Sequence, residues 1–128
     1  YLQIGAPGVP SQSSAAREAA LKERAQYEKL VAALEAALTA GKGDAQGWRM
    51  LAQGYRNLDQ PAKSLDALKR SVPWLKEKGQ PVPPDILAAL GAGLVSEGQG
   101  TVTAAAAEAL HAALAAEPAN MTARFYLG

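Results

Sequence analysis

GWRMLAQGY, residues 47–55, is the stretch that decides the fold of this chain. Its large apolar residues and one small residue recur at the i, i+3, i+4 and i+7 spacing of a single helix face: Trp48, Leu51, Ala52 and Tyr55. A small side chain among large ones lets a second helix approach closely, while the large ones fill the space around it. The stretch therefore predicts a helix that packs against a partner helix along one face.

The same pattern returns twice further along the chain. In LAALGAGL its positions are taken by Leu87, Leu90, Gly91 and Leu94, and in RFYLG they begin again with Arg124, Leu127 and Gly128. This is the W-x2-L-G-x2-Y template of a tetratricopeptide repeat, a unit of about 34 residues made of two antiparallel helices. The chain is therefore predicted to be all-α, a tetratricopeptide-repeat solenoid of helix pairs. An unrelated helical bundle whose spacing matches the template is the alternative.

The composition favours helices and excludes several classes of function. Apolar residues make up 48% of the 128 residues but aromatic ones only 5%, and most of the apolar residues are Ala and Leu, which favour helix over strand. Thirteen basic and twelve acidic side chains give a net charge of +1, so no nucleic-acid partner is expected. The chain has no cysteine, which excludes disulfides, thiolate catalysis and direct haem attachment through a CxxCH motif.

Breaker residues divide the chain into helices. Residues 1–13 are rich in Gly, Pro and Ser and are predicted to form an extended arm. A packed helix follows over about 14–40, where Gly41 ends it, and Asp44 can cap the next helix. Further helices are expected over about 45–58, from Pro61, over about 84–96, from an N-cap at Thr103 to Ala116, and after Asn120.

Pro73 falls inside the helix that begins at Pro61. A proline in a helix interior removes one backbone hydrogen bond, and its ring clashes with the preceding turn. A kink or a stop is therefore predicted near Ser71 to Val72.

The repeat spacing assigns these helices to units. Counting from the first helix of each unit, the second-helix positions fall on Ser64 and Leu68, and then on Ala106 and Leu110 if three residues are inserted in the turn near 98–101. The predicted units are a half repeat over 14–43, repeat one over 44–82, repeat two over 83–118 and the start of repeat three over 119–128.

Repeat stacks present the first helix of each pair on a concave surface that binds peptides. The residues predicted to line this groove are Arg49, Gln53, Arg56, Asn57, Ala88, Ala92, Val95 and Phe125. One end of the groove is basic and polar, and the other is apolar. The pattern therefore predicts an amphipathic helix as the ligand, with its carboxyl end or acidic face near the two arginines.

Two other functions are weighed against this one. A co-chaperone that clamps a terminal carboxylate needs donors from successive repeats, and the second repeat supplies none. The sequence offers few candidate catalytic residues for an enzyme, because His111 is the only histidine and lies among alanines one turn after Glu108. No second ligand stands at a spacing that would hold a metal with it. We therefore expect no catalytic residue, no metal and no cofactor.

Four segments resemble the periplasmic repeat region of the CcmI/CycH family of cytochrome c biogenesis proteins. They are YLQIGAPGVP at 1–10, GWRMLAQGY at 47–55, EGQGTVTAAAAEALHAAL at 97–114 and EPANMTARFYLG at 117–128. The last two are more specific than the general repeat template. The stretch from Pro73 to Pro84 departs from the family's pattern.

The resemblance implies a non-catalytic scaffold or chaperone that holds apocytochrome c, chiefly by its C-terminal helix, for delivery to the haem-ligation complex. It implies that residues 1–13 are a linker following a membrane span outside this sequence. It also implies that the chain is a periplasmic domain of a protein anchored in a bacterial inner membrane. A general tetratricopeptide-repeat interaction or co-chaperone module, with another peptide partner, is the alternative.

Overall fold

The chain is all-helical in the part that the structure describes. The computed structural model describes the backbone of residues 8–128 and the side chains of residues 14–128. These residues form six helices and no strand: α1 (Gly8–Thr39), α2 (Ala45–Asn57), α3 (Pro61–Glu77), α4 (Pro84–Glu97), α5 (Ala104–Ala116) and α6 (Met121–Leu127). The predicted all-α class is confirmed.

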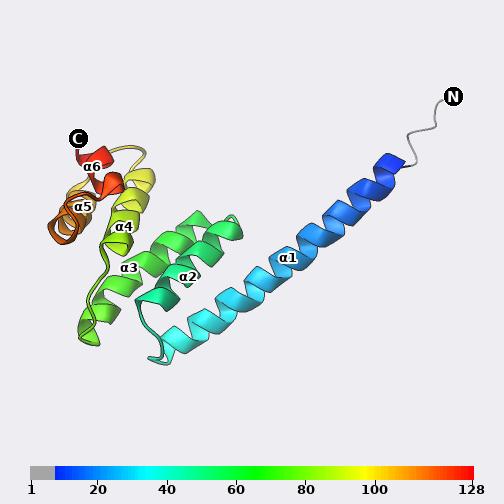
Figure 1. The fold of residues 1–128 in the computed structure, drawn as a ribbon, viewed down its shortest axis with the longest axis horizontal. Helices are drawn as coiled ribbons and strands as arrows, with labels where there is room; N and C mark the ends of the chain where they lie inside the picture. The colour runs from blue at the N-terminus through cyan, green and yellow to red at the C-terminus, as the bar shows by residue number, and fades with distance from the viewer. Residues whose placement is uncertain (1–7) are drawn as a thin grey trace.

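The helices form two antiparallel hairpins with one further helix at each end (Figure 1). In the first hairpin Trp48, near the start of α2, meets Trp74, near the end of α3, with ring centroids 5.7 Å apart. The second hairpin is made of α4 and α5. Helix α1 packs on α2, and α6 packs against both α4 and α5. Each helix thus contacts its neighbour in sequence, so the packing is built from local pairs.

Three of the predicted helix caps form as expected. The Asp44 side chain accepts from the backbone N–H groups of Gln46 and Gly47 at the start of α2. Thr103 Oγ1 accepts from the Ala106 N–H at 3.2 Å, and Asn120 Oδ1 accepts from the Ala123 N–H at 2.9 Å. These side chains satisfy backbone donors that have no partner within the helix, and they fix where α2, α5 and α6 begin.

The first helix begins earlier than predicted. Helix α1 starts at Gly8, so residues 8–13 are helical and do not form an extended arm. Pro10 is compatible with this start because it lies in the first turn, where backbone N–H groups have no partner within the helix. The rest of the predicted arm, residues 1–7, lies outside the described residues.

Of the kink or stop predicted near Ser71 to Val72, the stop is wrong, because α3 continues through Pro73 to Glu77. Proline leaves the carbonyl of Lys69 without its helical donor, but both residues are exposed, so water can reach that carbonyl. The turn after Pro73 is anchored by Trp74 and Leu75. The Trp74 indole N–H donates to the Leu38 carbonyl at 3.1 Å, and Leu75 is fully buried.

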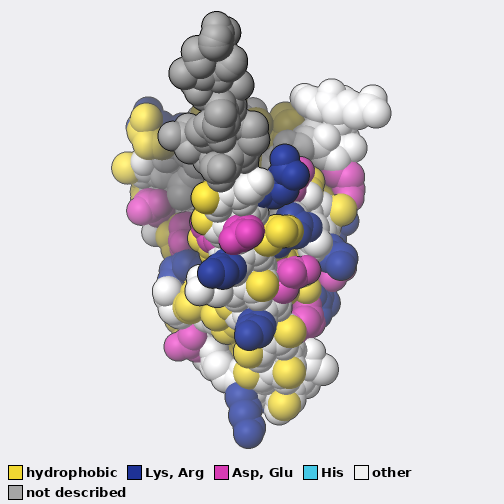
Figure 2. All heavy atoms as spheres, turned by 90° about the vertical axis from the view of Figure 1, so that its right-hand side faces the viewer, with side chains coloured by type: hydrophobic (Ala, Val, Ile, Leu, Met, Phe, Trp, Pro, Cys, Tyr) yellow, Lys and Arg dark blue, Asp and Glu magenta, His cyan; other side chains and the backbone are white. Residues whose placement is uncertain are grey.

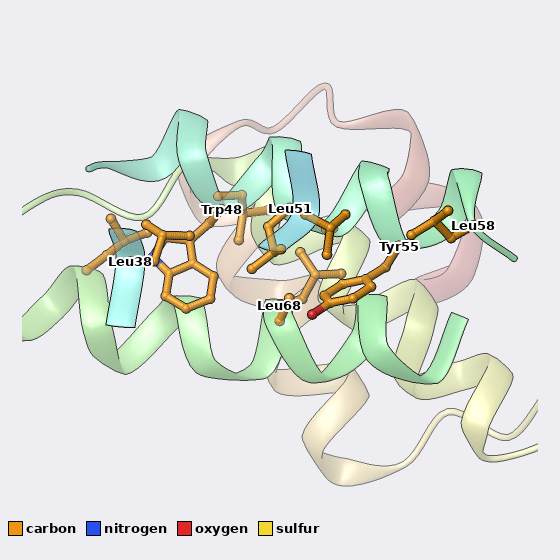
Figure 3. Packing of buried hydrophobic residues seen from close by; sticks show 11 residues of the cluster. Leu38, Trp48, Leu51, Tyr55, Leu58 and Leu68 are labelled. Atoms are coloured by element: carbon orange, nitrogen blue, oxygen red, sulfur yellow. The ribbon is translucent and has the colours of Figure 1, made fainter. Parts of the chain in front are cut away.

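The core of the first hairpin is made of large side chains (Figure 3). Trp48, Leu51 and Tyr55 of α2 point towards α3, where Leu68 lies between them, and Leu38 reaches in from α1. Ser64 is one of the small residues of the buried α3 face, and its hydroxyl donates to the Ala52 carbonyl at 2.9 Å. The pairing of Ser64 and Leu68 with the GWRMLAQGY face is therefore the one that the spacing predicts.

A partly buried cluster of polar side chains connects α1 to this hairpin. The Glu35 carboxylate accepts two hydrogen bonds from the Arg70 guanidinium, at 2.7 and 2.9 Å, and one from the Tyr55 hydroxyl at 2.9 Å. The hydrogen bonds from Arg70 hold the pKa of Glu35 below its usual value. Arg70 also stacks on the Trp48 ring, 5.5 Å from its centroid. The cluster therefore connects α1, α2 and α3 through one arginine.

The second hairpin is packed through small residues. Ala88 and Gly91 of α4 face Ala106, Leu110 and Ala113 of α5, all of them buried. A Cβ placed on Gly91 would lie 2.5 Å from two carbon atoms of Leu110, so only glycine fits at this crossing. The predicted second-helix positions Ala106 and Leu110 are thus both in the core, opposite Gly91.

Candidate functional site

The eight residues of the predicted groove do not form one surface. Arg49 is held in an ion pair: its guanidinium makes two hydrogen bonds to the Asp85 carboxylate at the start of α4, one of them 3.0 Å long. It also donates to the Gln46 side chain at 2.9 Å. The hydrogen bond from Arg49 lowers the pKa of Asp85 and raises that of Arg49. Arg49 therefore links the two hairpins and is not a free donor for a ligand.

Two apolar groove residues are corrected by the structure. Ala88 is 3% exposed and Val95 is 5% exposed, and both lie in the core that α4 forms with α5 and α6. A peptide cannot reach either side chain unless that core opens. The repeat template places both residues on the concave side, but α6 covers this part of α4 through Ala123.

Three other predicted residues are exposed but lie elsewhere. Gln53 and Asn57 occupy the same exposed face of α2, where the Gln53 amide donates to Asn57 at 3.3 Å. Phe125 is 79% exposed and lies beside His111 and Met121, on the surface formed by α5 and α6. These residues do not share a cavity with one another.

The remaining two predicted residues, Arg56 and Ala92, both line a pocket between the hairpins. The pocket has a volume of about 530 Å³ and is bounded by α2, α3, α4 and α6. Most of its lining is apolar or small, and its residues are Arg56, Pro61, Ala62, Ser64, Leu65, Leu68, Ala89, Ala92, Gly93, Ser96, Glu97 and Tyr126. We call it the inter-hairpin pocket.

The pocket exists because large side chains fill the space between the hairpins at one end, while small residues border it further along. Ile86, in the first turn of α4, joins the core of the first hairpin, and Arg49 bridges to Asp85 beside it. Further along α4 the pocket is lined by Ala89, Ala92 and Gly93; Leu65 packs on Gly93, and the small size of these residues leaves the remaining space open. Of the residues that line this space, only Arg56 and Ala92 were predicted from the sequence as binding residues. The signal that points to it is the run of small residues on the second face of α4.

Leu65 closes the floor of the pocket. It is 8% exposed, and its side chain lies against Gly93, where an added Cβ would come within 2.7 Å of a Leu65 methyl carbon. At the rim the Lys69 ammonium lies 3.4 Å from the Glu97 carboxylate. This pair is exposed on both sides, so it contributes little to stability, but it offsets the charge of Glu97.

Arg56 is the other charged residue of the lining, and it makes no ion pair with the described residues. The inter-hairpin pocket thus combines an apolar floor with one cation at its edge. Such an arrangement suits an apolar side chain that is accompanied by a negative charge. It does not assemble a nucleophile with a base, and no group of three metal-ligating residues exists among the described residues.

Comparisons with protein-family models, with curated proteins and with solved structures found no match to this chain. Among residues 8–128, no helix has both the length and the apolar character that crossing a bilayer requires.

Proposed function

We propose that the chain is a non-catalytic scaffold of the tetratricopeptide-repeat kind that binds an amphipathic helix in the inter-hairpin pocket. The two antiparallel hairpins and the buried positions of Trp48, Ala52, Gly91 and Leu110 support the repeat architecture. The observation that carries the binding function is the pocket itself. It is an apolar hollow of about 530 Å³ at the junction of two helix pairs, within the roughly 300–1,000 Å³ range of ligand pockets.

We propose apocytochrome c as the partner, held chiefly by its C-terminal helix. This assignment rests on the resemblance to the CcmI/CycH family. With it come a place in the periplasm, an anchor in the inner membrane outside this sequence, and delivery of the apoprotein to the haem-ligation complex. The structure supports the assignment to the extent that a helix with an apolar stripe matches the apolar floor formed by Leu65, Leu68 and Ala92.

A pocket-filling substitution tests the proposed function. The probe is a synthetic peptide with the sequence of the C-terminal helix of a c-type cytochrome, titrated into the protein by calorimetry. Ala92→Trp places a large ring in the inter-hairpin pocket, so we expect the affinity for the peptide to fall at least about tenfold, which corresponds to 1.4 kcal/mol. Circular dichroism should show an unchanged helical content, because Ala92 is not part of either closely packed core.

The matched control is Ala112→Trp. Ala112 is an exposed alanine of α5 that does not line the inter-hairpin pocket, so this variant should bind the peptide as the unmodified protein does. Equal affinity in the Ala92 and Ala112 variants would remove the pocket as the binding site. A protein that does not bind the peptide at all would remove apocytochrome c as its partner.

A further inference from the structure

Two arginines lie seven residues apart in α2, and they have different surroundings. Arg49 and Arg56 are separated by two helical turns and so occupy the same face of the helix. Arg49 is neutralised by Asp85 of α4. Arg56 lines the inter-hairpin pocket and forms no ion pair with the described residues. The same face of α2 thus carries one arginine that is paired with a carboxylate and one that is not, among the described residues.

The register of α4 explains the difference. Helices α2 and α4 point in the same direction, because each is antiparallel to α3: Trp48 meets Trp74, and Leu65 near the start of α3 meets Gly93 late in α4. Moving seven residues from Asp85 along α4 leads to Ala92, just as moving seven residues from Arg49 leads to Arg56. Arg56 and Ala92 line the same pocket. Where the first arginine pairs with a carboxylate, the second borders a hollow that Ala92 also lines.

We propose that a partner helix supplies the missing carboxylate, so that the inter-hairpin pocket selects helices in which a Glu or Asp side chain lies one turn from an apolar anchor. The inference rests on the proposed function, because it concerns the ligand of the same pocket. The anchor packs on Leu65 and Leu68, and the acidic side chain pairs with Arg56 as Asp85 pairs with Arg49. Glu97, which also lines the pocket, pairs with Lys69 and not with Arg56.

The geometry favours a carboxylate over other acceptors for a physical reason. A guanidinium presents parallel N–H donors that match both oxygens of a carboxylate, and the pair beside it shows that this face of α2 accepts such a geometry. Arg56 is exposed at the edge of the pocket, so the pair is screened by solvent on one side and bordered by the apolar lining on the other. Replacing the carboxylate with a neutral amide should therefore weaken binding by about five- to tenfold.

The test uses three designed helical peptides with the same leucine stripe and with acetylated and amidated ends. One carries Glu next to the stripe, the second carries Gln at the same position and the third carries Lys. Blocking the ends removes the terminal carboxylate, so any preference for Glu reports the side chain. By calorimetry the full chain should bind the Glu peptide about five- to tenfold more tightly than the Gln peptide and should bind the Lys peptide least tightly.

Two variants assign that preference to Arg56. Arg56→Gln should bind the Glu and Gln peptides equally, and Ala92→Asp should do the same, because it places a carboxylate of the chain itself in the pocket that Arg56 lines. Arg124→Gln is the control, because it removes the same charge from an exposed residue outside the inter-hairpin pocket. This variant should still bind the Glu peptide more tightly than the Gln peptide.

The outcomes separate the inference from the proposed function. Equal binding of the Glu and Gln peptides by the unmodified protein, or a preference that survives Arg56→Gln, would overturn the inference while leaving a peptide-binding pocket. If none of the three peptides binds, both are overturned.

Discussion

The two hairpins are both antiparallel, but large side chains fill the first and small ones fill most of the second. Between α2 and α3 the space is filled by Trp48, Leu51, Tyr55 and Leu68, with a single hydroxyl contact at Ser64. Between α4 and α5 the helices meet at Gly91, and most of the buried residues around Leu110 are alanines. The first core is sensitive to the loss of volume and the second to its addition, because both interiors are already packed.

The largest effect is expected from removing volume in the first hairpin. Leu51 is fully buried between α2 and α3. Leu51→Ala leaves a cavity as well as losing apolar burial, so the free energy of unfolding should fall by about 2–5 kcal/mol. Urea unfolding followed by circular dichroism measures this change. Met50→Ala is the neighbouring control, because Met50 is 40% exposed. A loss no larger than that of the control would contradict the packing described for α2.

Adding volume to the second hairpin should have the next largest effect. Gly91→Val forces its methyl groups against Leu110, which is fully buried and has little room to move. The expected loss is about 1–3 kcal/mol in the same unfolding measurement. Ser96→Ala is the control: Ser96 is exposed in the same helix, so its substitution should change stability little. A stabilised Gly91 variant would show that α4 and α5 are not in close contact at this residue.

The smallest of the three effects concerns the polar cluster of Glu35, Arg70 and Tyr55, which joins α1 to the first hairpin. Glu35→Gln weakens the hydrogen bonds from Arg70 and Tyr55, and because Glu35 is part-exposed the loss should be about 1 kcal/mol at neutral pH. The pKa of Glu35 is lower in the folded chain than its usual value of 4.5. Its contribution is therefore complete above pH 4.5 and is lost as the pH falls through the folded pKa.

Unfolding measured as a function of pH separates this contribution from the others. The stability difference between the unmodified protein and Glu35→Gln should be constant above about pH 5 and should shrink below it, in the region where carboxylates take up protons. A difference that does not depend on pH down to pH 3 would mean that Glu35 acts through packing and not through its charge.

Local sequence signals predicted the all-helical class and three helix caps, whereas features that depend on long-range contacts were not predicted. The caps at Asp44, Thr103 and Asn120 depend on neighbouring residues, so they were visible in the sequence. The extension of α3 through Pro73 was not, because it depends on Trp74 contacting Leu38, 36 residues away. Propensity at a proline is a local quantity, and a contact with a residue of another helix can override it.

The candidate site was predictable only in part for the same reason. Arg49 and Arg56 look alike in the sequence, and only the position of Asp85 in the folded chain distinguishes them. The template assigned Ala88 and Val95 to a groove, but the contact of α4 with α6 buries both. Arg56 and Ala92 remain, because the small residues of α4 leave the space beside them open.

The most direct measurement is a titration of the isotope-labelled protein with the Glu-bearing helical peptide, followed by backbone amide chemical shifts. If the inter-hairpin pocket binds the peptide, the amides of Leu65, Gly93 and Tyr126 should shift in proportion to occupancy, while that of Gly100, in the exposed turn after α4, should not. Shifts confined to His111, Met121 and Phe125 would place the peptide on the surface formed by α5 and α6 and would contradict the proposed site.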